Sequence, residues 1–243
     1  PTSSVNLIMS GICIGWNTAL DAPDGMDVDM GESYEIMWPY ILGWQTMSKN
    51  RKFDFTVGVG VNWKNFRMTD EVRFSREPNG NTVLTNYPEG AHIGFSRAKV
   101  FSWTVPFEVK YYLTDQVSLS ASSIVNFNTY ASLKTRYTMS EGQSVKELDT
   151  HLHPNPVTVD FMGHLKYGAL GLYVKYSPCN VFESGKGPKF QSWSTGITFG
   201  FYRAPVNVVI TATDDTATLS TDLTTGDIAI VKIGKHSIKV AIK

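Results

Sequence analysis

Residues 53 to 63 read Phe-Asp-Phe-Thr-Val-Gly-Val-Gly-Val-Asn-Trp. Large apolar side chains occupy every odd position, and polar residues or glycine occupy every even position. Side chains alternate between the two faces of a β-strand, so one face here is apolar and the other is polar or bare. Aromatic residues at the ends of the apolar face, with valines between them, are typical of a strand that crosses a bilayer. About 9–11 tilted residues are enough for that crossing.

Strand-like segments recur along the chain, and their connections alternate between long and short. We predict strands at 5–18, 33–47, 52–68, 97–112, 117–137, 156–167, 170–178 and 190–203. The connections at 19–32, 69–96 and 138–155 are long, whereas those at 48–51, 113–116 and 168–170 are tight. In an antiparallel sheet this order places the long loops at one end and the tight turns at the other. The chain is therefore predicted to be all-β, an eight-stranded antiparallel up-and-down transmembrane β-barrel with a small periplasmic β-hairpin segment.

Charged residues of both signs alternate with the apolar ones and are expected to face the interior. Eight strands leave room inside for side chains only, so we expect a filled lumen and no open pore. The predicted polar network of the lumen comprises Asp54, Lys64, Glu108, Lys110, Asp160, His164, Lys166 and Lys175. The predicted membrane belt comprises Trp63, Trp103, Trp193, Phe199 and Phe201. Because proline removes one donor from the ladder, a bulge or kink is expected at Pro39 and at Pro106.

Residues 205–243 differ in character from the rest of the chain. Residues 206–211 are expected to form one short strand, and a threonine-rich acidic stretch follows. Residues 227–243 predict a hairpin that turns at Gly234-Lys235-His236. This segment has no aromatic belt, so we place it outside the membrane. The domains expected are a transmembrane barrel at 1–204 and a periplasmic β-rich appendage at 205–243.

Composition excludes several classes of protein. The chain of 243 residues has 22 Lys and Arg against 22 Asp and Glu, which leaves no net field to attract nucleic acid. No run of 18 apolar residues is present, which excludes a transmembrane helix but not a barrel. No signal peptide is visible at Pro1, so a mature chain with its leader removed is expected. Cys13 lies in an apolar run and is interpreted as an inert buried thiol.

Three groups of residues invite a chemical interpretation, and each has a simpler one. The acidic residues of the first loop have the oxygen ligands that calcium takes, but a solvated outer loop is favoured; they are Asp21, Asp24, Asp27, Asp29 and Glu32. Asp149, His151 and His153 suggest a transition-metal or hydrolase site, yet they lie in a long polar loop. His164 is interpreted as a member of the lumen network and not as a general base, because no paired nucleophile accompanies it. No cofactor and no metal are expected.

Several motifs occur in order along the chain: Gly-Val-Gly-Val-Asn-Trp-Lys-Asn-Phe-Arg (58–67), Trp-Thr-Val-Pro-Phe-Glu (103–108), Leu-Tyr-Val-Lys-Tyr-Ser-Pro (172–178), Val-Phe (181–182) and Gly-Lys-Gly-Pro (185–188). They resemble motifs of Bacteroidota outer-membrane β-barrel proteins, eight-stranded barrels of the PorT-like or OmpA-like kind. The resemblance covers about 5–203, and it implies a location in the bacterial outer membrane but no particular activity. Residues 225–240 resemble a segment that usually precedes such barrels. An alternative interpretation is that 205–243 is an N-terminal segment that precedes the barrel.

The function expected from these features is that of an integral outer-membrane protein without enzymatic activity. It would be a structural or accessory subunit of an envelope complex. Its partners would be the lipid bilayer and other outer-membrane or periplasmic protein subunits, with no nucleic acid. One alternative is an outer-membrane barrel enzyme, a protease or lipid hydrolase, with its site at the extracellular rim. A second alternative is a soluble β-barrel that binds a ligand inside.

Overall fold

The computed structural model describes residues 5–48, 52–69, 72–150, 152–200, 209–213, 216–220, 228–233 and 236–241. The chain divides into two compact units, Pro1–Phe201 and Tyr202–Lys243, and each is described by itself. The described residues include no helix with the length and hydropathy needed to cross a bilayer.

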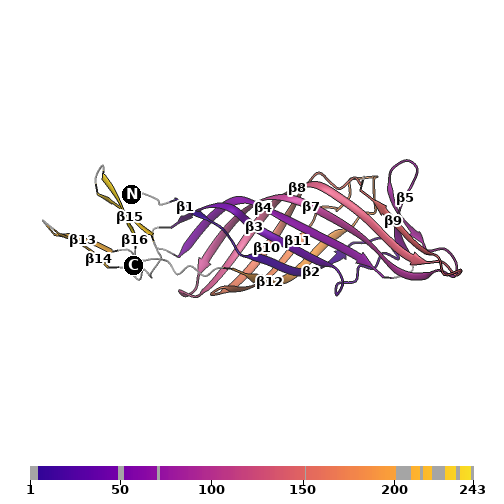
Figure 1. The fold of residues 1–243 in the computed structure, drawn as a ribbon, viewed down its shortest axis with the longest axis horizontal. Helices are drawn as coiled ribbons and strands as arrows, with labels where there is room; N and C mark the ends of the chain where they lie inside the picture. The colour runs from indigo at the N-terminus through magenta and orange to yellow at the C-terminus, as the bar shows by residue number, and fades with distance from the viewer. Residues whose placement is uncertain are drawn as a thin grey trace. The chain divides into compact units, whose positions relative to one another are not determined.

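The first unit is built around one antiparallel sheet that closes on itself. Its wall consists of β1 (Val5–Ile8), β2 (Ile12–Leu20), β3 (Tyr34–Met47), β4 (Phe53–Met68), β7 (His92–Tyr112), β8 (Val117–Thr138), β10 (Val157–Tyr167), β11 (Leu170–Ser177) and β12 (Gln191–Phe199). β1 and β2 both pair with β3 and together occupy one position in the wall. Each later strand pairs with the next in this order, and β12 pairs with β2 to close the ring. The result is the predicted eight-stranded antiparallel barrel (Figure 1).

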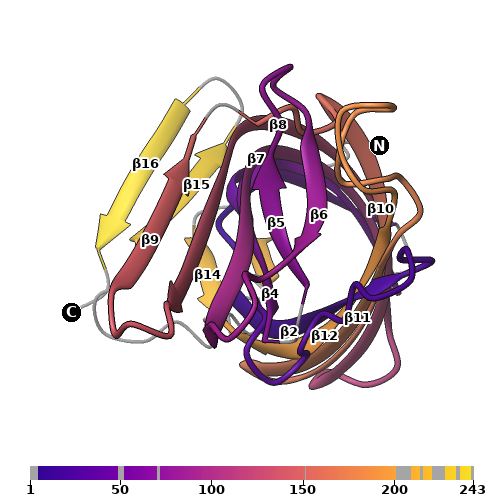
Figure 2. The same ribbon diagram turned by 90° about the vertical axis from the view of Figure 1, so that its right-hand side faces the viewer.

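Three further strands lie in the described parts of the long connections, and the sequence patterns do not predict them. β5 (Val72–Arg76) and β6 (Thr82–Asn86) form a hairpin between β4 and β7. β9 (Ser144–Asp149) pairs with the far end of β8. Figure 2 looks along the barrel from the end with the long loops and shows the β5–β6 hairpin across the opening, with β9 beside β8.

The two longest strands reach well past the length that a bilayer requires. β7 has 21 residues and β8 has 22, whereas about 9–11 tilted residues cross the hydrocarbon core. The tight turns fix one end of the wall, since Leu113 N–H bonds to the Val117 carbonyl and Gly200 N–H to the Ala169 carbonyl. The surplus length of β7 and β8 therefore lies at the end with the long loops.

The two prolines in the wall have different effects. The register between β3 and β4 shifts between Trp38 and Leu42, so the bulge predicted at Pro39 is confirmed. At Pro106 the predicted bulge is absent, because Pro106 stays in register with Ile124 of β8. The ladder to β4 is instead interrupted at residues 58–59, which accommodates the missing proline donor.

Within its described residues the second unit contains two hairpins. β15 (Ile228–Ile233) pairs with β16 (His236–Ala241), which confirms the predicted hairpin, while its turn residues 234–235 lie outside the described residues. β13 (Val209–Thr213) pairs with β14 (Thr216–Ser220). β13 overlaps the short strand expected at 206–211, of which residues 206–208 lie outside the described residues. The threonine-rich stretch supplies a second strand, since β-branched residues pack well on a pleated surface.

Candidate functional site

The outer surface of the barrel is apolar in a band around its middle. On β7 the side chains of Trp103, Phe107 and Val109 are 48%, 51% and 44% exposed, while Thr104 and Glu108 between them are buried. The same alternation follows on β2, β4, β8, β10, β11 and β12. A soluble barrel would bury its apolar face, so this exterior has the polarity of a barrel that lipid surrounds.

The centre of the barrel holds a group of four charged side chains. Lys64 Nζ lies 3.1 Å from Asp160 Oδ2, and Lys175 Nζ lies 3.3 Å from the same oxygen. Lys175 also forms an ion pair with Glu35. Two cations and two anions thus neutralise one another inside the wall, where an unpaired charge would cost several kcal/mol.

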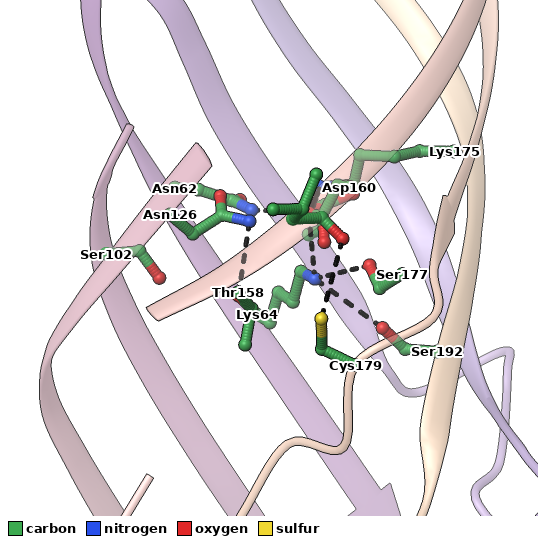
Figure 3. A network of polar contacts seen from close by, with 12 residues as sticks. Asn62, Lys64, Ser102, Asn126, Thr158, Asp160, Lys175, Ser177, Cys179 and Ser192 are labelled. Carbon is green, nitrogen blue, oxygen red and sulfur yellow. Dashed lines mark hydrogen bonds and ion pairs between the residues drawn. The ribbon is translucent and has the colours of Figure 1, made fainter. Parts of the chain in front are cut away.

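Neutral side chains add hydrogen bonds to this central ion group. Lys64 Nζ donates to Ser177 Oγ at 2.8 Å and to Ser192 Oγ at 3.5 Å (Figure 3). Asn62 Nδ2 donates to Glu35 Oε1 at 2.8 Å. Partners on β3, β4, β10, β11 and β12 converge here, so the group ties strands on opposite sides of the barrel together.

Glu35 was missed among the predicted lumen residues. It lies between Tyr34 and Ile36, which are both exposed, and it is itself fully buried. The alternation Tyr-Glu-Ile-Met-Trp at 34–38 carries the signal. Pro39 follows this stretch and interrupts the alternation, which makes the signal weaker than on the neighbouring strands.

The remaining predicted lumen residues lie nearer the tight turns. Lys110 Nζ is 3.3 Å from Glu108 Oε1, and Ser120 Oγ donates to Glu108 Oε2 at 3.0 Å. Asp54 Oδ2 accepts from Gln45 Nε2 and from Tyr112 Oη, both at 2.5 Å. The structure therefore separates the predicted network into layers along the barrel.

His164 belongs to the layer of Glu108 and not to that of Asp160. Its charged neighbours are Lys166, Glu108 and Lys110. A Cβ added at Gly171 would lie 2.5 Å from His164 Nε2, so the imidazole occupies the space that the glycine leaves. In this position the imidazole of His164 packs against the barrel wall.

The interior becomes apolar towards the long loops, which the sequence patterns did not predict. Buried side chains from the wall meet others from the loops and the β5–β6 hairpin. The cluster comprises Met26, Val28, Phe66, Met68, Phe74, Ala98, Val100, Ala131, Leu133, Leu152, Val181, Phe182 and Phe190. Phe190 packs edge-on against Phe66 and Phe182, with ring centroids 5.2 and 6.0 Å apart. A hydrophobic core therefore fills this end of the barrel.

The polarity of both faces of the wall reverses at one level. On β4 the inward side changes from Lys64 to the buried Phe66, while the outward side changes from Trp63 to Arg67. On β7 the inward Ala98 and Val100 are buried, and Arg97 and Lys99 alternate with them. Water outside a wall demands charge outside and apolar groups within, whereas lipid allows the reverse. The reversal therefore marks where the apolar band ends.

Aromatic residues border the apolar band. Trp63, Trp103, Trp193 and Phe199 of the predicted belt are all exposed on the outer surface. The rings of Trp63 and Phe101 lie 4.6 Å apart at the level of the polarity reversal. Phe201, the last member of the predicted belt, lies outside the described residues.

The other candidate sites do not assemble into a metal or catalytic centre within the described residues. No three or more of their His, Cys, Asp and Glu side chains are placed to hold a metal ion. In the acidic first loop, Glu32 pairs with Arg67 at 2.7 Å. Asp149 is bound by Arg76, and His151 lies outside the described residues. Cys13 is buried as predicted, with its Sγ 3.2 Å from Thr198 Oγ1.

These features define the class of the first unit: a closed eight-stranded antiparallel barrel with an apolar exterior and a filled interior. No protein-family model and no curated protein sequence matches the chain. Among solved structures the chain is similar to Ail, the attachment invasion locus protein of Yersinia pestis, at 13% identity over 79% of this chain and 98% of Ail. The TM-score is 0.35 for Ail alone and 0.34 for Ail in complex with the heparin analogue sucrose octasulfate. The fold assignment rests on the strand pairing of this chain itself.

Proposed function

We propose that this chain is an integral protein of a bacterial outer membrane, with a structural or accessory role and no enzymatic activity. The apolar band on the outer surface carries the proposal, since exposed apolar area of this extent needs a covering of lipid. Closed barrels satisfy every backbone group without an edge, as a bilayer requires. The motifs at 58–67, 103–108, 172–178 and 185–188 support placing the chain with the PorT-like or OmpA-like barrels of Bacteroidota.

A transport role has less support than a structural one. The central ion group occupies the middle of the barrel, and the hydrophobic core fills the end with the long loops. The ligand-binding soluble barrel would need an apolar cavity inside and a polar surface outside. Over the middle of the observed barrel, the outer surface is apolar and the interior holds charged side chains.

Membrane integration is tested by alkaline carbonate extraction of envelopes from cells that express the chain. We expect the protein to stay in the membrane pellet and to be released only by detergent. Release into the aqueous supernatant would overturn the proposal, because peripheral and soluble proteins leave under these conditions.

The proposed accessory role is tested by purification after mild detergent extraction. The β13–β14 and β15–β16 hairpins each have two strands and therefore two edges, to which a partner strand can add. We expect coelution with another envelope protein that is lost when residues 205–243 are deleted. A strictly monomeric particle from native envelopes would contradict the accessory role and leave the membrane proposal intact.

A further inference from the structure

A cluster of cations begins on the outer surface directly beyond the aromatic border of the apolar band and extends towards the long loops. We call it the basic patch; it comprises Arg67 of β4, Arg97 and Lys99 of β7, Lys134 and Arg136 of β8, and Lys146 of β9. The hydrophobic core lies behind it on the inner face of the same strands. The patch thus belongs to the part of the wall that faces water and lipid headgroups.

Like charges face one another across the strands of the patch. Arg97 is opposite Arg67 on one side and Lys134 on the other, and Arg136 is opposite Lys146. Like charges in directly opposite positions destabilise a sheet. This arrangement therefore costs stability unless anions from elsewhere neutralise it.

The side chains of the patch converge on one ring. The guanidinium carbons of Arg67, Arg97 and Arg136 lie 4.6, 5.6 and 5.9 Å from the centroid of Phe95. The pKa of Lys134 is lowered, first by desolvation and then by the positive charges of Arg136, Arg97, Lys146 and Lys99. The ring holds the guanidinium groups close together and so concentrates positive charge.

The protein supplies little negative charge to this face. Arg67 pairs with Glu32, and across the described part of the chain no ion pair involves Arg97, Lys99, Lys134, Arg136 or Lys146. Nearby cations of the β5–β6 hairpin are neutralised, since Arg73 lies 2.6 Å from Glu147 and Arg76 lies 2.8 Å from Asp149. The basic patch therefore differs from the cations of the β5–β6 hairpin, which are paired with carboxylates.

The edge of the patch nearest the apolar band lies at the height of lipid phosphates. Lys99 precedes the border residue Phe101 by two positions and Arg97 precedes it by four, which is about 7 and 13 Å along a strand. The polar layer on each side of a bilayer is roughly 5–8 Å thick. Lysine and arginine side chains extend towards that layer from either side.

We propose that the basic patch binds the phosphate groups of anionic lipids in the bilayer leaflet around this end of the barrel. The guanidinium groups of Arg97 and Arg136 would donate paired hydrogen bonds to phosphate oxygens, and the lysines would add charge. Such lipids neutralise the like charges and fix the depth of the barrel. The proposal rests on the membrane insertion proposed above.

The test measures binding of lipid A to the full chain in detergent micelles by native mass spectrometry. Bisphosphorylated lipid A is compared with its dephosphorylated form, for the wild type and for the double variant R97Q/R136Q. We expect the wild type to prefer the phosphorylated lipid, and the variant to bind it roughly 30-fold more weakly. The matched control K186Q/K189Q removes two exposed lysines from the loop at 182–189 and should stay within about twofold of wild type.

Several outcomes separate the possible failures. Equal binding of both lipids, or equal loss in the variant and the control, would overturn the patch proposal. If R97Q/R136Q lost binding of soluble heparin but kept that of lipid A, the patch would be assigned to a soluble polyanion instead. Carbonate extraction of the same variants reports on insertion separately, so a chain released from envelopes would defeat the proposed function first.

Discussion

Replacement of Asp160 by asparagine is expected to lower the free energy of unfolding by about 3–5 kcal/mol. Asp160 Oδ2 accepts from both Lys64 and Lys175, so the change leaves two buried cations with Glu35 as the remaining anion of the central ion group. Urea unfolding of the chain in lipid vesicles, followed by tryptophan fluorescence, measures the effect.

A compensated variant provides the control for this prediction. D160N/K64M removes one charge of each sign and leaves Lys175 paired with Glu35. Since replacing a buried ion pair by neutral groups is often close to neutral, we expect the double variant to recover most of the lost stability. A loss below about 1 kcal/mol for D160N alone would show that the interior is hydrated enough to make the pairing unimportant.

Substitution of Gly60 by alanine is expected to destabilise the barrel by at least about 3 kcal/mol. A Cβ at Gly60 would lie 2.2 Å from the carbonyl oxygen of Pro39 and 2.3 Å from that of Trp38. Both carbonyls belong to the β3 bulge, so the backbone itself would have to move. The urea midpoint in vesicles measures this effect.

Gly163 offers a matched control in the same wall. A Cβ there would meet only Val174 Cγ2, at an ordinary contact distance of 3.6 Å. We expect G163A to change stability by less than about 1 kcal/mol in either direction. Similar losses for G60A and G163A would contradict a specific role for Gly60 at the bulge.

The sequence predicts the strands of this barrel well because two local signals agree. Alternation of apolar and polar residues defines each strand, and the tight turns define where one end of the wall lies. The stretch at 53–63 lies within β4 (Phe53–Met68), whose limits are close to the expected 52–68. The β5–β6 hairpin and β9 were missed because their short strands lack a regular apolar face.

The arrangement of the interior was harder to predict for a physical reason. Alternation persists through the polarity reversal, since Lys64 and Phe66 point the same way although one is charged and the other apolar. A test of period two therefore finds the strand but not the level at which the apolar band ends. Partners such as Lys64 and Asp160 lie 96 residues apart, so only the closed register reveals that they meet.

The central claim is that β7 passes from water into lipid between Lys99 and Trp103. The test uses spin labels in lipid vesicles, attached to single cysteines in a C13S/C179S background. The labelled positions are 97, 99, 103, 105, 107 and 109. Collision rates of each label with oxygen and with a water-soluble nickel complex report whether it lies in lipid or in water. We predict nickel contact at 97 and 99 and oxygen contact from 103 to 109. Nickel contact at every position would contradict the account, because it would place the apolar band in water.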